Sequence, residues 1–176
     1  RDLTNVVPAY SNTDMDSIDM AYDNGVGVLI LSSLTDSSIG MAFPAFAVNT
    51  TPGEVWNMQF SYRTDILHTA GFYFRVYEYD SDMPSGKTHV SSDAINSDTR
   101  VQQSTRLKAV SPTYENVGTG ITYQAGYTQY IPSATAKWAS IVILNWTSIG
   151  LDKLYIKNIS TTKTQQSFNT QLAHNT

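Results

Sequence analysis

Residues 71–80, with the sequence GFYFRVYEYD, restrict the fold of this chain more than any other segment. The segment is dense in aromatic and β-branched residues and opens with a glycine, which is typical of a β-strand. Because successive side chains of a strand point to opposite faces, Phe72, Phe74 and Val76 should pack on a dry core. The opposite face carries bulky side chains with polar tips, namely Tyr73, Arg75, Tyr77 and Tyr79. That face suits a sugar ring, but strand tyrosines can also simply cover a sheet.

Residues 55–63 alternate between apolar and polar side chains, which is the pattern of a half-buried strand in an antiparallel sheet. Because only a short connection separates them from residues 71–80, we expect the two strands to pair as a hairpin. Pairing would join their polar faces into one surface of amide, guanidinium and phenol groups. The candidate ligand contacts on this joint face are Asn57, Gln59, Arg63, Tyr73, Arg75, Tyr77 and Tyr79, with Trp146 as an outlying stacking residue.

The other apolar segments also favour strands. Residues 136–146 include Ile-Val-Ile-Leu without alternation, which predicts a strand covered on both faces. Residues 40–48 contain Pro44, which cannot donate to a ladder, so this strand should lie at an edge or carry a bulge. No stretch shows a helical period, and residues 80–120 read as a long loop packed over one end of the domain. The sequence therefore predicts an all-β domain over residues 1–160, an antiparallel β-sandwich of jelly-roll type, followed by a polar tail over residues 161–176.

Composition and charge exclude several functions. The net charge is -4 and the sequence contains no basic stripe, which argues against nucleic-acid binding. No apolar run approaches the roughly 20 residues of a membrane span, so we expect no membrane insertion. The chain has no cysteine, which excludes disulfides and thiolate metal ligands. Charged residues make up only 15%, and Ser, Thr, Asn and Gln take their place, as is usual in extracellular β-proteins.

The sequence offers no catalytic constellation. Its three histidines, His68, His89 and His174, lie far apart and have no partner at metal-ligand spacing. Glu78 and Asp80 share a strand face at a separation of about 7 Å, as in an inverting glycosidase, but any two carboxylates at positions i and i+2 do so. We therefore expect no enzymatic activity and no cofactor apart from the metal considered next.

The acidic segment 12–19 has two interpretations. Asp14, Asp16 and Asp19 recur at short intervals, and aspartates spaced in this way can wrap one calcium ion with oxygen ligands. The segment lacks the glycine and the glutamate that an EF-hand loop needs at its sixth and twelfth positions. It is therefore either a solvated acidic turn or an isolated structural calcium site.

Three segments resemble a known group of proteins. The longest is residues 71–91, GFYFRVYEYDSDMPSGKTHVS, and the others are residues 136–146, AKWASIVILNW, and 154–157, LYIK. Together they resemble the carbohydrate-binding-module-like domains near the C-terminal end of bacteriophage tail-fibre and tailspike proteins. The resemblance covers residues 50–160 and designates no sugar-contacting positions, so the candidate contacts rest on the strand faces.

The resemblance implies a non-catalytic, homotrimeric module of the virion tail, outside the host cell, that attaches the particle to bacterial surface polysaccharide. Shallow sugar sites bind weakly, and three copies on one repetitive polysaccharide would gain through effective concentration. An alternative is a trimerisation or folding cap without a ligand, in which the tyrosine face would be buried between subunits. A more distant alternative is a polysaccharide hydrolase.

Overall fold

The structure, a computed structural model, describes residues 6–8, 18–23, 25–33, 39–64, 72–91, 99–102, 113–114, 123–145 and 152–165 of the 176-residue chain. Strands are the regular secondary structure over these ranges, which contain no helix. Accordingly, no helix in this part of the chain is long and apolar enough to cross a membrane. The predicted all-β class is confirmed, and every strand pair in the two main sheets is antiparallel.

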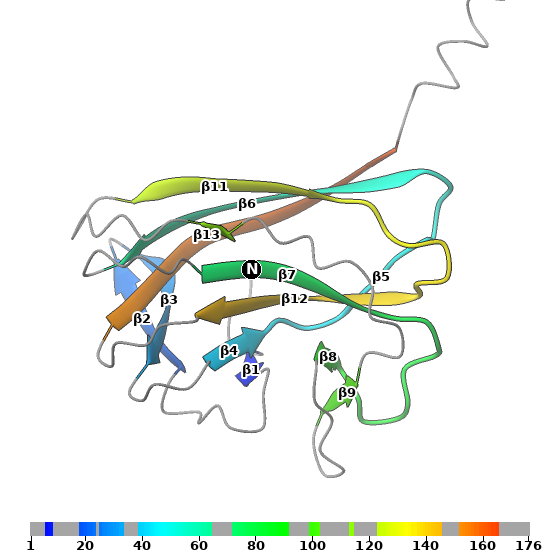
Figure 1. The fold of residues 1–176 in the computed structure, drawn as a ribbon, viewed down its shortest axis with the longest axis horizontal. Helices are drawn as coiled ribbons and strands as arrows, with labels where there is room; N and C mark the ends of the chain where they lie inside the picture. Colours follow the sequence, from blue (N-terminus) through cyan, green and yellow to red (C-terminus); the bar gives the residue numbers. More distant parts are fainter. Residues whose placement is uncertain are drawn as a thin grey trace, which may run out of the picture.

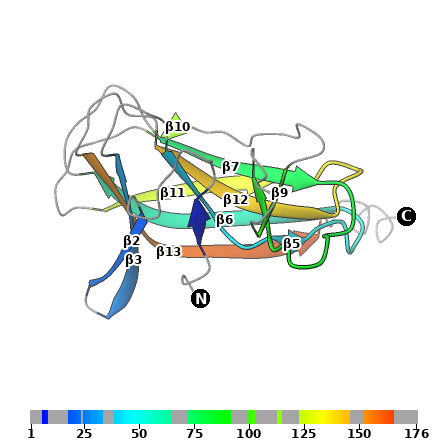
Figure 2. The ribbon, with the colours of Figure 1, turned by 90° about the horizontal axis from the view of Figure 1, so that it is seen from below.

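Two sheets stack face to face as the layers of a β-sandwich of jelly-roll type (Figures 1 and 2). The A sheet has the order β1 (Val7–Pro8), β4 (Ile39–Ala42), β12 (Trp138–Asn145), β7 (Phe72–Tyr79) and β10 (Thr113–Tyr114), and β5 (Phe46–Ala47) also pairs with β12. The B sheet has the order β11 (Gln124–Tyr130), β6 (Glu54–Thr64), β13 (Asp152–Gln165), β3 (Val26–Ser33) and β2 (Ile18–Asp23).

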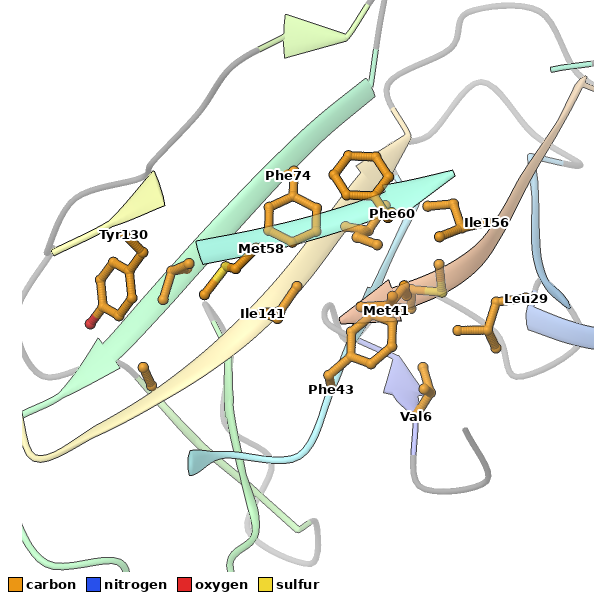
Figure 3. Close-up of a cluster of buried hydrophobic side chains, with 14 of the residues drawn as sticks. Val6, Leu29, Met41, Phe43, Met58, Phe60, Phe74, Tyr130, Ile141 and Ile156 are labelled. Atoms are coloured by element: carbon orange, nitrogen blue, oxygen red, sulfur yellow. The ribbon is translucent and has the colours of Figure 1, made fainter. Parts of the chain in front are cut away.

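The main hydrophobic core lies between the two sheets (Figure 3). Phe74 and Ile141 reach it from the A sheet, while Met58, Phe60 and Ile156 reach it from the B sheet. The rings of Phe60 and Phe74 stack across the interface, with centroids 4.8 Å apart and planes 2° from parallel. The apolar faces predicted from alternation in residues 55–63 and 71–80 are therefore confirmed for the side chains that the structure describes, which do not include that of Phe72.

A second apolar cluster covers the outer face of the A sheet. A short parallel pair, β8 (His89–Ser91) and β9 (Arg100–Gln102), packs there and contributes Val90 and Val101. Val142 of β12 meets them, and the Ser140 hydroxyl accepts a hydrogen bond of 2.9 Å from the Val90 amide. Strand β12 is thus buried on both faces, as its unbroken apolar run predicted.

Pro44 marks a bulge, as predicted. Strands β4 and β5 both pair with β12, but four steps along the chain from Ala42 to Phe46 match three steps from Val142 to Ala139. The extra residue falls in the segment around Pro44, which has no amide hydrogen to donate. Beside it, the Ala45 amide turns away and donates to the Thr88 carbonyl at 2.9 Å.

The predicted hairpin between residues 55–63 and 71–80 is wrong. Strand β6 lies in the B sheet between β11 and β13, whereas β7 lies in the A sheet between β12 and β10. The two strands face each other across the core instead of pairing edge to edge, because their apolar faces bury each other. Their polar faces consequently point to opposite sides of the molecule and form no joint surface.

The boundary predicted at residue 160 falls inside β13, which continues to Gln165. Residues 160–165 pair with β6 from Gln59 to Glu54, and their three threonines are β-branched residues suited to a strand. Strand β13 also carries a bulge, because three steps from Lys157 to Ser160 match two steps on β6. The remainder of the predicted tail, residues 166–176, lies outside the described residues.

Candidate functional site

The tyrosine-rich side of β7 is largely covered. Tyr77 is only 6% exposed, because its ring belongs to the apolar cluster under β8 and β9. Tyr79 is half-buried against the same cluster, and Arg75 is also half-buried. For Tyr73 the structure describes the backbone alone, and Trp146 lies outside the described residues. Tyr77 therefore covers the sheet and is closed to a ligand, which corrects the prediction of a ligand contact for this residue.

Three of the predicted contacts do share an exposed surface, which is the outer face of the B sheet. Asn57, Gln59 and Arg63 alternate along β6, and their side chains point away from the core. Strand β11 borders β6 on one side, and its register pairs Gln129 with Asn57, Tyr127 with Gln59 and Ala125 with Ser61. Strand β13 borders β6 on the other side, where Tyr155 pairs with Arg63 and Lys157 with Ser61. We call this surface the B face.

One end of the B face, the amide end, consists of Asn57, Tyr127 and Gln129. The Tyr127 hydroxyl donates to Asn57 Oδ1 at 2.8 Å, and Gln129 Nε2 donates to the same oxygen at 3.2 Å. Asn57 Nδ2 in turn donates to Thr164 Oγ1 at 3.3 Å. These bonds hold polar groups of three neighbouring strands in fixed positions, while the Tyr127 side chain remains 55% exposed.

The other end, the cationic end, consists of Arg63, Tyr123, Tyr155 and Lys157. The Arg63 guanidinium lies 3.6 Å from the ring centroid of Tyr155 and 5.5 Å from that of Tyr123. Lys157 Nζ lies 3.9 Å from the Tyr123 centroid. Both cations are therefore held against aromatic faces by cation–π attraction, and all four side chains are half-buried.

A shallow hollow of about 250 Å³ lies between the two ends. It forms where Ser61 and Ala125 are small, and its lining comprises Gln59, Phe60, Ser61, Ala125, Gly126, Tyr127 and Asn158. Asn158 sits at the bulge of β13 with a left-handed φ of 56°. The hollow is smaller than the 300–1,000 Å³ usual for a drug-sized ligand, so it suits a group that lies flat on the sheet.

The two carboxylates that resembled a glycosidase pair lie in different environments. Glu78 is 0% exposed inside the sandwich, where its Oε1 accepts hydrogen bonds from the Tyr130 hydroxyl and, at 3.0 Å, from the Ser133 amide. Burial, together with this bond to Glu78 and the negative charge of Glu78, raises the pKa of Tyr130, so the phenol keeps its proton. Asp80 is half-buried beyond the end of β7. Glu78 thus links the two sheets and is closed to a substrate.

A further buried carboxylate, that of Glu54, organises the turn before β6. It accepts hydrogen bonds from the amides of Asn49, Thr50 and Thr51 and from Trp56 Nε1. Burial by itself raises the pKa of Glu54, but these bonds and the nearby Lys163 outweigh it and leave the pKa below its usual value.

The calcium prediction remains a prediction. Asp14 and Asp16 lie outside the described residues, and for Asp19 only the backbone, within β2, is described. In the ranges whose placement is described, no group of three or more His, Asp or Glu side chains converges as a metal site would.

Comparisons with known proteins identify the fold. No family model and no curated protein matches the sequence. Among solved structures, the chain is similar to the enzymatically active domain of tailspike protein 4 from bacteriophage CBA120. The two share 13% identity with a TM-score of 0.55, and the match covers 93% of this chain and 20% of that one. The chain is also similar to the arabinose-bound α-L-arabinofuranosidase MgGH51, with 11% identity, a TM-score of 0.56, and coverage of 92% and 23%.

A third similar structure, a CBM4 module, has 8% identity and a TM-score of 0.50, and the match covers 90% of this chain and 95% of that one. The chain therefore spans about a fifth to a quarter of the two large proteins but nearly all of the small module. These similarities assign to the chain the β-sandwich fold of carbohydrate-binding modules.

Proposed function

We propose that the protein is a non-catalytic glycan-binding module whose ligand lies along the B face. The observation that carries the proposal is the arrangement of this face, where a shallow hollow separates exposed amide and phenol groups from a pair of aromatic-stacked cations. The fold, which the chain has in common with a carbohydrate-binding module, supports it. The buried position of Glu78 agrees with a module that has no catalytic carboxylate pair.

The chemistry of the B face matches that of a sugar ring. A pyranose presents hydroxyls around its edge and C–H groups on its faces, so it needs both hydrogen-bond partners and flat apolar surface. Asn57, Gln59 and Gln129 carry amides that can donate and accept, while the exposed Tyr127 ring offers a stacking surface with a polar tip. The hydrogen bonds at the amide end orient these groups before a ligand arrives, which lowers the entropic cost of binding.

The biological setting that we propose is a phage tail fibre or tailspike that attaches to bacterial surface polysaccharide as a homotrimer. The resemblance of residues 71–91 and 136–146 to such proteins supports this setting, and the fold similarity to a tailspike domain is compatible with it. A trimer would engage one repetitive polysaccharide through three weak sites, and effective concentration would raise the overall affinity. Light scattering tests the trimer, which should show three times the 19.5 kDa mass of the chain.

The proposed function is tested on a printed array of bacterial surface polysaccharides, with affinities for positive spots then measured by calorimetry. We expect Tyr127→Ala to weaken binding about three- to tenfold, because the variant loses the stacking ring and one bond of the amide end. The matched control is Tyr22→Ala, which removes a tyrosine that is 75% exposed on the edge strand β2. Wild-type protein that binds no polysaccharide would favour the alternative of a trimerisation cap without a ligand.

A further inference from the structure

The described side chains of the B face include three cations. The chain as a whole is acidic, with a net charge of -4. The B face nevertheless carries Arg63 on β6 and Lys153 and Lys157 on β13, since residues 153, 155 and 157 alternate with the buried Leu154 and Ile156. The four carboxylates with described side chains all lie elsewhere, Glu54 and Glu78 being buried and Asp80 and Asp82 following β7 of the A sheet. Among the described side chains, the B face thus carries three cations and no carboxylate, and we call Arg63, Lys153 and Lys157 the cationic patch.

The cations of this patch are oriented by their aromatic neighbours. Arg63 lies over Tyr155, and both Arg63 and Lys157 contact the ring of Tyr123. A guanidinium held over an aromatic ring still has N–H groups in its own plane, and these can bind a carboxylate or a phosphate through two parallel hydrogen bonds. Packing of this kind also restricts the side chains before binding, so less entropy is lost on contact with an anion.

The cationic end adjoins the hollow directly. Ser61, which lines the hollow, is paired in register with Lys157 on one side and with Ala125 on the other. A sugar ring that lay in the hollow would therefore place a substituent on one of its edges beside Lys157 and Arg63, and would leave hydroxyls on the opposite edge near Gln59 and Tyr127.

We infer that the glycan bound by the B face is anionic, and that an acidic group on the sugar, a uronate carboxylate or a phosphate, binds between Arg63 and Lys157. The inference rests on the proposed function and narrows its ligand class. The half-buried positions of both cations strengthen the attraction relative to fully exposed pairs, although salt still screens it. Neutral parts of the same polysaccharide extend toward the amide end.

The test uses the full chain and an array on which each acidic polysaccharide stands beside a neutralised counterpart. Carboxyl reduction converts uronates to neutral sugars, and hydrogen fluoride removes phosphates, so the two treatments distinguish the source of the charge. Arg63→Gln and Lys157→Gln should each weaken binding about five- to tenfold, as expected for loss of a charge-assisted contact. The control is Lys137→Gln, which removes a lysine that is 52% exposed and paired with Asp82 beside the A sheet.

The outcomes separate the inference from the proposed function. Binding that disappears on neutralisation of the glycan, falls with rising salt, and is weakened by both glutamine variants supports the anionic ligand. Binding that survives neutralisation and both variants but is weakened in Tyr127→Ala overturns the inference and leaves the proposed function standing. Absence of binding to every polysaccharide overturns both. Thermal unfolding of each variant checks its fold, and the salt dependence of the unaltered protein decides the matter if Arg63→Gln fails to fold.

Discussion

Gly126 provides the sharpest test of how the B face is built on the core. This glycine lies in β11 directly opposite Phe60 of β6, and a methyl group at its Cα would sit 2.3 Å from Phe60 Cζ and 2.4 Å from Cε2. No real contact is that short, so an alanine forces the phenyl ring or the strand to move. The ring has little freedom, because Phe60 is buried and stacked on Phe74.

The expected cost of Gly126→Ala follows from this geometry. Overpacking in a filled core costs about 1–3 kcal/mol, and the parallel stack with Phe74 places this site near the upper end, at about 2–3 kcal/mol. For a chain of this length the melting temperature should then fall by roughly 4–12 °C. The neighbouring exposed residue gives the control, since Ala125→Ser should change the free energy of unfolding by less than about 0.5 kcal/mol.

A double-mutant cycle, measured by urea denaturation, assigns the cost to the ring of Phe60. Phe60→Leu alone destabilises through the space that it leaves, but it also opens room for a methyl group at residue 126. The double variant should therefore be more stable than the two single changes predict, by about 1 kcal/mol or more. A neutral Gly126→Ala, or strictly additive costs, would falsify the claim that Phe60 occupies the position of the missing side chain.

Two further predictions concern the buried carboxylates. Tyr130→Phe should destabilise the protein by about 1–3 kcal/mol in thermal unfolding, because it removes the hydroxyl that donates to Glu78 Oε1. The other carboxylate oxygen, Oε2, already has no hydrogen-bond partner among the described residues. An unchanged melting temperature would contradict this prediction. The pKa of Glu54 is lowered in the folded protein, so the unfolded chain binds the proton more tightly and stability rises with pH across this titration. The free energy of unfolding should therefore fall as the pH drops below 4.5, the ordinary pKa of a glutamate. Glu54→Gln should flatten this dependence on pH. An equal slope in the variant would show that another group is responsible.

The faces of individual strands could be predicted from sequence because alternation is local. The inward positions of Met58, Phe60 and Phe74 and the double burial of β12 followed directly from the pattern of side chains. Strand partners could not be predicted in this way. Strand β6 pairs with β11 and β13, which lie far along the chain, and the rule that neighbouring strands pair favoured β7 instead.

Because strand partners could not be predicted, the candidate site was only partly predicted. Alternation predicted that Tyr77 faces away from the core, but nothing in its own strand indicates that β8 and β9 cover it. The residues that were missed, among them Tyr127 and Tyr123, did leave a signal. They are four positions apart and so share a strand face, while Tyr130 lies on the other face and is buried. That signal becomes useful only once β11 is known to border β6.

The bulge at Asn158 determines which side chains can meet the same ligand. Before it, odd-numbered residues such as Tyr155 and Lys157 point outward; after it, the even-numbered Ser160 and Thr164 stand opposite the outward side of β6. Lys157 and Thr164 are seven residues apart, so an uninterrupted strand would turn them to opposite sides of the sheet. The additional residue at the bulge, where Asn158 has a left-handed conformation, thus changes which residues of β13 point outward. As a result, one surface carries positive charge at one end and uncharged hydrogen-bonding groups at the other.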